Sequence, residues 1–484
     1  MTRKLRSALA FILAMLCLIS TAACGGNTEE SSAPADGSTD ASDIISEVLS
    51  EEESDAEESS KAEEKSWLPE ITGYTDTDAE GKAQRDPNYK AVNYEKMRGI
   101  WMSQYDMMSL YRTGDGQKPE DRFEVMIDKI CAAVVKAGLN TIVVQLRPNG
   151  DSFYPSDLYA PSYYVVGAYG NEFEYDMLKV FIRIAHSYGL SFHAWVNPMR
   201  LMSGDSIEDT DDKYVIKQWY NDPEKREYNL YEHTDELYYL VPGVQENKQL
   251  VWDGVTEICK RYNVDAVNID DYFYPTTADA FDAEHFSEVC EDFGGNNGLA
   301  RRRYRLDAVN TLVHGMYEAV KAVDPSIWFG ISPAGSISNN LTTLYADVNT
   351  WCKYEGYCDY IIPQVYWGFE NVPESQKFDV CSTDWQKICT NDNIRLMIGI
   401  GLYRWTSTED EFAEYKEKKE SIKRQLEFLE TMEKNDGFVF YTFADLFHTN
   451  GTYTGNSRER KAMLPVLKKF GGDLASTIVP VPAE

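Results

Sequence analysis

Short runs rich in β-branched and aromatic residues alternate with helix-like segments between residues 97 and 443, and this alternation restricts the folds open to the chain. A strand that rejoins its sheet after a helix makes a right-handed crossover and lies parallel to its predecessor. Eight such units predict an α/β fold, a (β/α)8 TIM barrel with insertions. The expected strands are 97–103, 140–147, 190–197, 264–271, 327–332, 360–366, 394–400 and 437–443, and helix-like stretches include 121–137, 176–188, 250–262, 303–323 and 409–434.

The first residues predict export. Three basic residues precede an apolar run at 8–19, which is short for a membrane span, and small residues then lead to Cys24. The local sequence TAAC-GG resembles a bacterial lipoprotein processing site, although Thr21 stands where such sites usually carry Leu. We therefore expect a lipoprotein signal peptide at 1–23 and a lipidated Cys24 that anchors the protein outside the cytoplasm. Signal cleavage without a lipid, or an uncleaved N-terminal anchor, is the alternative.

A polar, acidic stretch follows Cys24. Residues 25–66 contain fourteen acidic residues against Lys61 and Lys65, and almost no large apolar side chains. Such a segment cannot bury enough apolar surface to offset its ordering entropy, so residues 24–66 are expected to form a disordered linker. Residues 67–484 keep a net charge of about −23 without a basic stripe, which argues against nucleic acid as a partner.

The remaining chain divides into three expected parts. Residues 67–96 form an N-terminal extension, either a cap on the barrel or more tether; residues 97–470 form the barrel domain; residues 471–484 form a C-terminal tail. The seven cysteines beyond Cys24 are odd in number and show no C-x-x-C spacing, so neither a disulfide framework nor a structural zinc site is expected. One bridge within the cluster from Cys352 to Cys389 is the alternative.

One strand ends in two adjacent carboxylates, in the sequence VDAVNIDDYFYP at 264–275. Burying an unpaired carboxylate is costly, and the carboxyl ends of barrel strands build active sites. Because successive residues of a strand face opposite sides, Asn268 and Asp270 should point into the barrel, with Asp271 at the rim. The same alternation in the second strand sends Val143, Gln145 and Arg147 inward.

Two long insertions, 150–175 and 201–248, are rich in tyrosine and acidic residues. Loops at this face of a barrel usually wall a binding cleft, and aromatic rings can cover the apolar faces of sugars. A sugar cleft is therefore expected, with Tyr154 among its residues. The alternative is that these aromatic residues only pack the loops onto the barrel.

The strand ends resemble those of the bacterial glycosyl hydrolase-like 10 family over nearly all of residues 95–470. The resemblance implies a TIM-barrel glycoside hydrolase, and for related proteins peptidoglycan glycan strands have been proposed as substrate. The segments that carry it are RGIWMS (98–103), GLNTIVVQLRPNGDSFYPSDLYAPS (138–162), HAWVNPMR (193–200), YNVDAVNIDDYFYP (262–275), FGISPAG (329–335), DYIIPQVYW (359–367) and GFVFYTFADL (437–446).

Glycoside hydrolysis usually needs one carboxylic acid and a second carboxylate. Asp270 is the expected acid, because a pocket floor raises the pKa of a carboxyl and Asp271 adds like charge. The seventh strand ends in GIGLYRW without a carboxylate, so the second group is open among Asp106, Asp151, Glu370 and Asp445. In a substrate-assisted alternative the acetamido group of an N-acetylhexosamine attacks, helped by an aspartate of the pair and by Tyr366.

The remaining site predictions concern binding. No clustered His and carboxylate ligands exist, so no metal and no cofactor are expected, and the protein is expected to be a monomer. A carbohydrate-binding surface protein that has lost turnover is the alternative to an enzyme. The expected substrate-binding residues, among which an arginine would suit a lactyl or peptide carboxylate, are Arg147, His193, Asn197, Arg200, Gln364, Trp367 and Tyr154.

Overall fold

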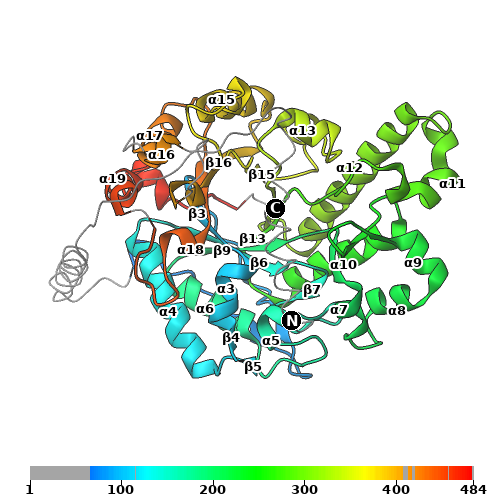
Figure 1. The fold of residues 1–484 in the computed structure, drawn as a ribbon. Coiled ribbons are helices and arrows are strands. Elements are labelled where there is room, and N and C mark those ends of the chain that lie inside the picture. Colours follow the sequence, from blue (N-terminus) through cyan, green and yellow to red (C-terminus); the bar gives the residue numbers. More distant parts are fainter. Residues whose placement is uncertain (1–65, 115, 407–412, 417–419, 456, 482–484) are drawn as a thin grey trace, which may run out of the picture. The chain divides into compact units, whose positions relative to one another are not determined.

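A closed barrel of eight parallel strands organises the described part of the chain, as the sequence predicts (Figure 1). The structure is a computed structural model, and it describes residues 66–481 apart from 115, 407–412, 417–419 and 456. The predicted signal peptide, Cys24 and nearly all of the predicted linker lie outside these residues. In sequence order the barrel strands are β3 (Met97–Met102), β6 (Thr141–Arg147), β9 (Ser191–Val196), β13 (Ala266–Ile269), β14 (Trp328–Ile331), β15 (Tyr360–Ile361), β16 (Arg395–Gly401) and β17 (Gly437–Tyr441).

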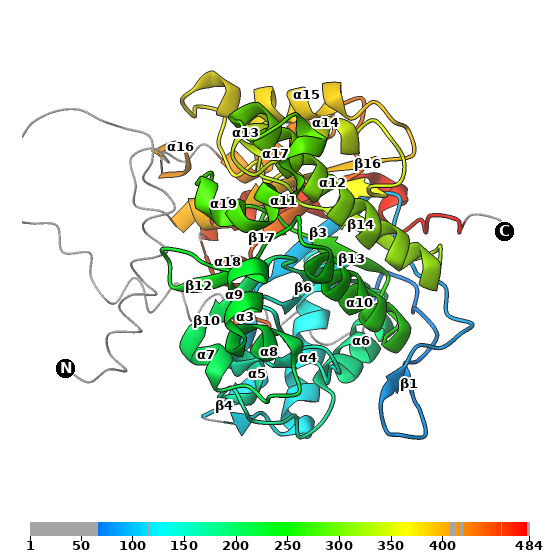
Figure 2. The same ribbon diagram turned by 90° about the vertical axis from the view of Figure 1, so that its right-hand side faces the viewer.

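Helices surround the strands in sequence order, and β17 pairs with β3 to close the ring (Figures 1 and 2). The helices are α3 (Gln104–Tyr111), α4 (Glu120–Lys136), α5 (Tyr163–Val166), α6 (Met177–Ser187), α7 (Gly204–Glu208), α8 (Val215–Asn221), α9 (Pro223–Asn229), α10 (Gln245–Arg261), α11 (Ala283–Phe293), α12 (Gly298–Val323), α13 (Ile337–Thr342), α14 (Val348–Trp351), α15 (Phe378–Ile388), α16 (Ala413–Lys416), α17 (Ser421–Leu429), α18 (Phe443–Leu446) and α19 (Ser457–Leu467).

Two predicted elements differ from the structure. The sixth strand was expected over 360–366, but β15 contains only two residues, because Pro363 has no N–H for the ladder. Beyond that point Gln364 makes single bridges to Ala334 and Gly399. The helix expected over 409–434 is also wrong: its described residues form the short helices α16 and α17, and Glu420 between them has a φ of 51°, which no α-helix contains.

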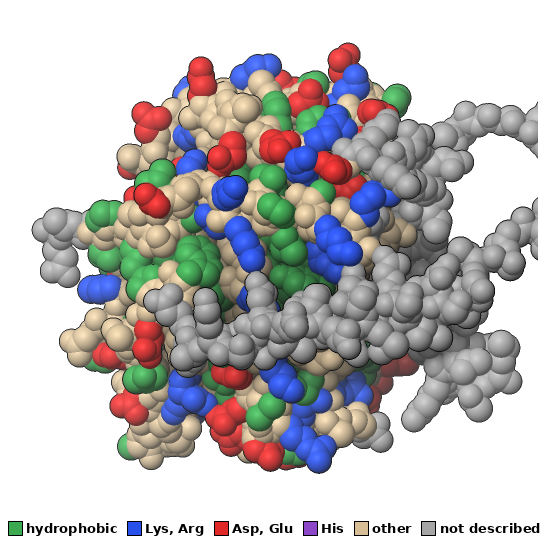
Figure 3. All heavy atoms as spheres, turned by 90° about the vertical axis from the view of Figure 1, so that its left-hand side faces the viewer, with side chains coloured by type: hydrophobic (Ala, Val, Ile, Leu, Met, Phe, Trp, Pro, Cys, Tyr) green, Lys and Arg blue, Asp and Glu red, His purple; other side chains and the backbone are tan. Residues whose placement is uncertain are grey.

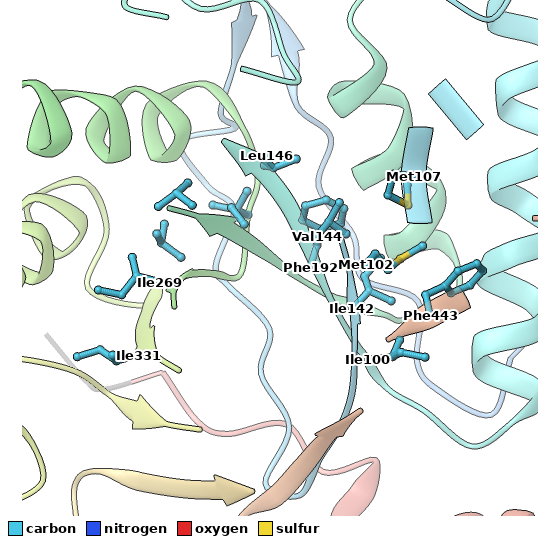
Figure 4. Close-up of a cluster of buried hydrophobic side chains, with 14 of the residues drawn as sticks. Ile100, Met102, Met107, Ile142, Val144, Leu146, Phe192, Ile269, Ile331 and Phe443 are labelled. Atoms are coloured by element: carbon cyan, nitrogen blue, oxygen red, sulfur yellow. The ribbon is translucent and has the colours of Figure 1, made fainter. Parts of the chain in front are cut away.

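Strand alternation separates two hydrophobic layers, as the sequence predicts. Ile142, Val144 and Leu146 of β6 are buried against the helices, together with side chains of β3 and β9 (Figure 4). Val143, between them in sequence, belongs to a smaller cluster that fills the barrel interior with Trp101, Trp195, Tyr360 and others. The interior is therefore a packed core. At the carboxyl ends of the strands, this core forms the floor of the barrel mouth.

Residues 66–96 pack against the end of the barrel at which the strands begin. The Arg85 guanidinium donates to the carbonyls of Tyr262 and Val264 and pairs with Asp324 at 3.2 Å. Tyr89 Oη donates to the buried carboxylate of Asp265, which also contacts His186 Nε2 at 3.0 Å. Of the two possibilities left open by the sequence, the described residues of this extension form a cap.

Short strand pairs lie in the extension and in the insertions between the barrel strands. They are β1 (Asp76–Thr77) with β2 (Ala83–Gln84), β4 (Arg112–Thr113) with β5 (Gly116–Gln117), β7 (Asp151–Ser152) with β8 (Ala160–Pro161), and β12 (Leu237–Leu240) between β10 (Arg200–Ser203) and β11 (Leu230–Glu232). Figure 3 shows acidic and basic side chains interspersed over one face of the molecule. After the barrel, Val479 N donates to the carbonyl of Asn93, so the chain returns to the extension.

Candidate functional site

Asp270 lies directly after β13 and points into the barrel mouth, as strand alternation predicts. Its side chain is 4% exposed. One carboxylate oxygen, Oδ2, accepts hydrogen bonds from Trp195 Nε1 at 3.1 Å and from Asn197 Nδ2. The other, Oδ1, accepts from the backbone N–H of Tyr272 at 3.3 Å. The carboxyl group is thus held in one orientation by donors from two adjacent strand ends.

A row of amides extends this hydrogen-bond network across the mouth. Gln145 Nε2 donates to Asn197 Oδ1 at 2.6 Å, and Gln145 Oε1 accepts from the backbone N–H of Gln104 at 2.8 Å. The row therefore connects the first turn of α3 with the ends of β6, β9 and β13. The structure brings Asn197 to Asp270 as a positioning group for its carboxyl.

Asp271 faces the opposite wall of the mouth. Gln364 Nε2 donates to Asp271 Oδ1 at 3.3 Å and to the carbonyl of Ser332 at 3.0 Å. Gln364 lies beyond β15, so the fourth, fifth and sixth strand ends meet at this carboxylate. Strand alternation predicts that the side chains of Asp270 and Asp271 point in different directions. The structure shows that they also have different hydrogen-bond partners.

The two carboxyls perturb each other electrostatically. Burial, followed by the negative charge of Asp271, raises the pKa of Asp270 to about 7, and the Arg200 guanidinium opposes this shift. Burial also raises the pKa of Asp271, while Gln364 and Arg200 favour its charged form. Because Asp270 is the more enclosed of the two, we assign the proton of the pair to Asp270 near neutral pH.

Arg200 lies beside this pair. Its Nε donates to the carbonyl of Pro148 at 2.9 Å, and its guanidinium lies 4.3 Å from the ring centroid of Tyr272. Nearby tyrosines and Asp270 keep the pKa of Arg200 above its usual value despite burial. The structure thus places a permanent cation next to the two carboxyls, where it limits how far their pKa values rise.

The loop that follows Asp271 is clamped from α12. Arg305 makes two hydrogen bonds to the buried carboxylate of Asp282, at 2.7 and 2.9 Å. Its Nη1 also donates to the carbonyl of Thr277 at 3.0 Å and to Tyr345 Oη at 2.9 Å. A paired and fully bonded buried ion pair holds its surroundings in one arrangement, so the loop beyond the carboxyls is rigidly supported.

An aromatic cluster forms the wall opposite β9. The rings of Tyr366 and Tyr441 stack at 5.5 Å, and both meet Trp101 edge-on at 6.5 and 6.2 Å. Tyr403 contacts Tyr366 edge-on at 6.0 Å. Burial and then the neighbouring tyrosines raise the pKa of Tyr366, with smaller contributions from Asp271 and Asp270, so its hydroxyl stays protonated. Of this cluster, sequence reasoning singled out only Tyr366, although strand alternation also sends Trp101, Trp195 and Tyr441 inward.

The structure places Arg147 away from the mouth, which corrects the inward orientation predicted for it. The ladder between β6 and β9 shifts register between Gln145 and Arg147, and this bulge turns the side chain toward α10. There the guanidinium lies 4.4 Å from the ring centroid of Tyr159, and Nη1 lies against Gly254 of α10, where an added Cβ would clash with it. Arg147 is 1% exposed and does not reach a substrate.

His193 and Tyr154 also lie away from the carboxyl pair. His193 is fully buried near the start of β9, where Nδ1 contacts Tyr360 Oη at 2.9 Å, so it belongs to the lower interior. Tyr154 is fully buried with Oη 3.4 Å from Glu257 on α10. The substrate-binding role predicted for these two residues is therefore corrected. Trp367 is half-buried, with its ring against Gly335 beyond β14, and its substrate-binding role stays a prediction.

Most of the insertion aromatics pack onto the barrel, as the alternative interpretation holds. Tyr159, Tyr164, Tyr238 and Tyr239 are buried. Tyr159 Oη, for example, donates to the carbonyl of Leu250 at 2.9 Å. Exposed tyrosines are few in the first insertion, where Tyr163 is 37% exposed.

The four candidates for a second carboxylate have other surroundings. Asp106 accepts from Ser103 and Thr442 and caps α3, and Asp151 accepts from Asn149 N and Tyr169 Oη, both at 3.0 Å. Glu370 is exposed beyond β15. Asp445 caps α18, and burial together with Asp106 raises its pKa to about 7. Asp106, Asp151 and Asp445 thus have hydrogen-bond partners of their own, whereas Asp271 is the direct neighbour of Asp270.

Within the described residues, no group of three or more His, Cys, Asp or Glu side chains is arranged to hold a metal ion. The seven described cysteines are buried, and none of them forms a disulfide with another described residue. The alternative of one bridge within the Cys352–Cys389 cluster is therefore not realised.

Comparison with known proteins identifies the family. Residues 96–417 match the family described as Glycosyl hydrolase-like 10. The chain belongs to this family. Glycosyl hydrolase YngK of Bacillus subtilis (strain 168) is 32% identical over 337 residues, which cover 66% of this chain and 62% of YngK. Glycosyl hydrolase DigH of Escherichia coli (strain K12) is 27% identical over 337 residues, covering 64% of this chain and 74% of DigH.

Structural likeness agrees with the fold. The glycoside hydrolase domain of PgaB (BpsB) from Bordetella bronchiseptica superposes with a TM-score of 0.51 at 10% identity, covering 77% of this chain and 99% of that domain. At this identity the likeness concerns the barrel alone. Membership of the Glycosyl hydrolase-like 10 family confirms the predicted resemblance and supports a glycosidase type of function acting on carbohydrate.

Proposed function

We propose that this member of the Glycosyl hydrolase-like 10 family cleaves O-glycosidic bonds of a polysaccharide at the mouth of the barrel. The observation that carries the proposal is the Asp270–Asp271 pair after β13, with the pKa of Asp270 raised to about 7 by burial and by its neighbour. A carboxyl that retains its proton near neutral pH and is oriented by three donors is what a general acid requires.

The proposed reaction divides the work between the two carboxyls. Asp270 donates its proton to the glycosidic oxygen as the bond to the leaving sugar breaks, and Asp271 remains ionised to stabilise positive charge that develops on the sugar ring. Tyr366, with its hydroxyl protonated, is positioned to hydrogen-bond a substituent of the same sugar. This arrangement suits an N-acetylhexosamine, whose acetamido oxygen attacks the anomeric carbon as the bond to the leaving sugar breaks; water then opens the cyclic intermediate and returns a proton to Asp270. Peptidoglycan glycan strands contain such sugars.

A panel of polymers tests the proposal. The purified protein is incubated with peptide-free glycan strands, chitooligosaccharides and plant polysaccharides, and the products are identified by mass spectrometry. Cleavage of an N-acetylhexosamine polymer with release of shorter chains is the expected result. Binding without cleavage across the whole panel would instead support the carbohydrate-binding alternative and refute the enzyme.

Trp195→Phe probes the acid directly. The Trp195 N–H donates to the carboxylate of Asp270 and lowers its pKa, so removing this donor should raise that pKa by about one unit. Activity that depends on protonated Asp270 should then persist to higher pH, shifting the alkaline limb of the kcat/KM profile upward by the same amount. An unchanged limb in a folded variant would show that another group controls it.

We also propose that Cys24 carries a lipid that anchors the protein outside the cytoplasm, in reach of a cell-wall substrate. No helix within the described ranges is long and apolar enough to cross a membrane. If the lipid is the anchor, Cys24→Ser removes it and should move the protein from the membrane fraction to the soluble extracytoplasmic fraction after cell fractionation. A variant that stays in the membrane fraction would instead indicate an uncleaved N-terminal anchor.

A further inference from the structure

Two exposed tyrosines lie on neighbouring short helices outside the pocket. Tyr105, on α3 directly after β3, is 46% exposed, and Tyr163, at the start of α5, is 37% exposed. Both rings contact the buried Tyr164, with centroids 5.9 Å from Tyr105 and 4.9 Å from Tyr163. Large aromatic rings exposed side by side on one surface mark a binding site more often than isolated exposed residues do.

The pair continues the surface of the candidate site. Tyr105 is close enough to Arg200, Tyr272 and Tyr441 to interact electrostatically with each of them. These three side chains surround the mouth in which Asp270 and Asp271 lie. The aromatic surface therefore extends from the pocket floor, past Tyr105, to Tyr163.

The two rings are held in place by their supports. The Arg112 guanidinium lies 4.9 Å from the Tyr163 ring centroid and donates to the Tyr163 carbonyl at 3.3 Å. Tyr163 Oη donates to Met108 Sδ on α3 at 3.8 Å, which joins the two helices. Tyr105 meets Tyr164 at an interplanar angle of 89°, edge to face. A preorganised ring loses little conformational freedom when a ligand stacks on it.

We infer that Tyr105 and Tyr163 form an outer sugar-binding subsite for a glycan chain that extends beyond the bond cleaved in the pocket. This inference rests on the proposed function and specifies its substrate as a chain of several sugars. Pyranose rings present apolar faces that stack on tyrosine, while their hydroxyls remain in water. The subsite therefore adds affinity for long oligosaccharides that a disaccharide cannot use.

Alanine substitutions at Tyr105 and Tyr163, singly and together, test the subsite on the full chain. The measured quantity is the ratio of kcat/KM for a hexasaccharide of N-acetylglucosamine to that for the disaccharide. Loss of each ring should lower this ratio by about tenfold. Tyr74→Ala is the matched control, because Tyr74 is 61% exposed on the extension that caps the opposite end of the barrel. A ratio equal to that of the control in the double variant would overturn the inference.

Binding separates this inference from the proposed function. Titration calorimetry with the same two sugars is run on the wild-type protein and on the double variant. If no cleavage occurs but the wild type alone prefers the hexasaccharide, the proposed hydrolysis fails and the subsite stands. If cleavage occurs with equal length preference in both proteins, the subsite fails and the hydrolase stands.

Discussion

Replacing Asp270 with Asn is expected to lower kcat on a susceptible polysaccharide by about 10²- to 10⁴-fold, the contribution usual for a positioned general acid. The amide keeps the size of the carboxyl, and its oxygen can still accept from Trp195 Nε1 and Asn197 Nδ2. The transferable proton is lost, together with the long hydrogen bond of 3.3 Å from the Tyr272 N–H to Oδ1. Binding of the substrate, measured by calorimetry, should therefore change far less than kcat.

Asp445→Asn is the matched control for this variant. Asp445 also follows a barrel strand, and burial together with Asp106 raises its pKa to about 7 as well. Its carboxylate, however, caps α18 by accepting from the backbone N–H of Thr442 at 3.1 Å, a role that asparagine also fills. A raised pKa alone should thus not make it catalytic. Wild-type turnover in Asp270→Asn, or an equal loss in Asp445→Asn, would contradict the assignment.

The same substitution should stabilise the protein in alkaline solution. The pKa of Asp270 is about 7 in the folded protein against an ordinary value of 3.8. A raised folded-state pKa contributes stability that is complete below the unfolded value and is lost as the pH rises through the folded value. Relative to wild type, the free energy of unfolding of Asp270→Asn should increase between pH 4 and pH 8 by up to about 4 kcal/mol.

Urea unfolding of both proteins across this pH range measures the difference. Comparing the two proteins at each pH cancels the titration of all other groups, provided that the substitution leaves them unchanged. Because Asp271 titrates together with Asp270, the gain should develop over a broad range rather than in one step. Asp292→Asn, at an exposed position on α11, is the control and should show a difference that does not vary with pH. A flat difference for Asp270→Asn would contradict the raised pKa.

These two predictions describe one trade-off. Keeping a buried carboxyl next to a second one is unfavourable once both are ionised, and the fold offsets this with Arg200 and with donors from β9. The same enclosure keeps the proton available near neutral pH. Activity and alkaline instability should therefore decrease together in the Asn variant, as expected when a strained site supports function.

Some features of the site follow from strand alternation, a local property. The inward position of Asp270 depends only on its place two residues after Asn268, and both side chains face the barrel interior. The same rule failed for Arg147, because the bulge in β6 arises from pairing with β9 and leaves no mark in the sequence of β6 alone. His193 faces inward, as alternation requires. Its depth in the barrel, however, depends on the residue at which the neighbouring strand β13 begins, because His193 pairs with Ala266, the first residue of that strand.

By itself the sequence determined the eight-strand barrel, its family and the strand end that carries the paired carboxyls. These features depend on hydrophobic periodicity and on polar residues at strand ends, and both patterns can be recognised in consecutive residues. The tertiary structure alone decided which groups surround Asp270. Trp195, Asn197 and Gln364 approach the pair from strands far apart in sequence, and most loop tyrosines turn inward to pack. Burial and electrostatic coupling depend on these distant contacts, and they raise the pKa of Asp270 toward neutral pH.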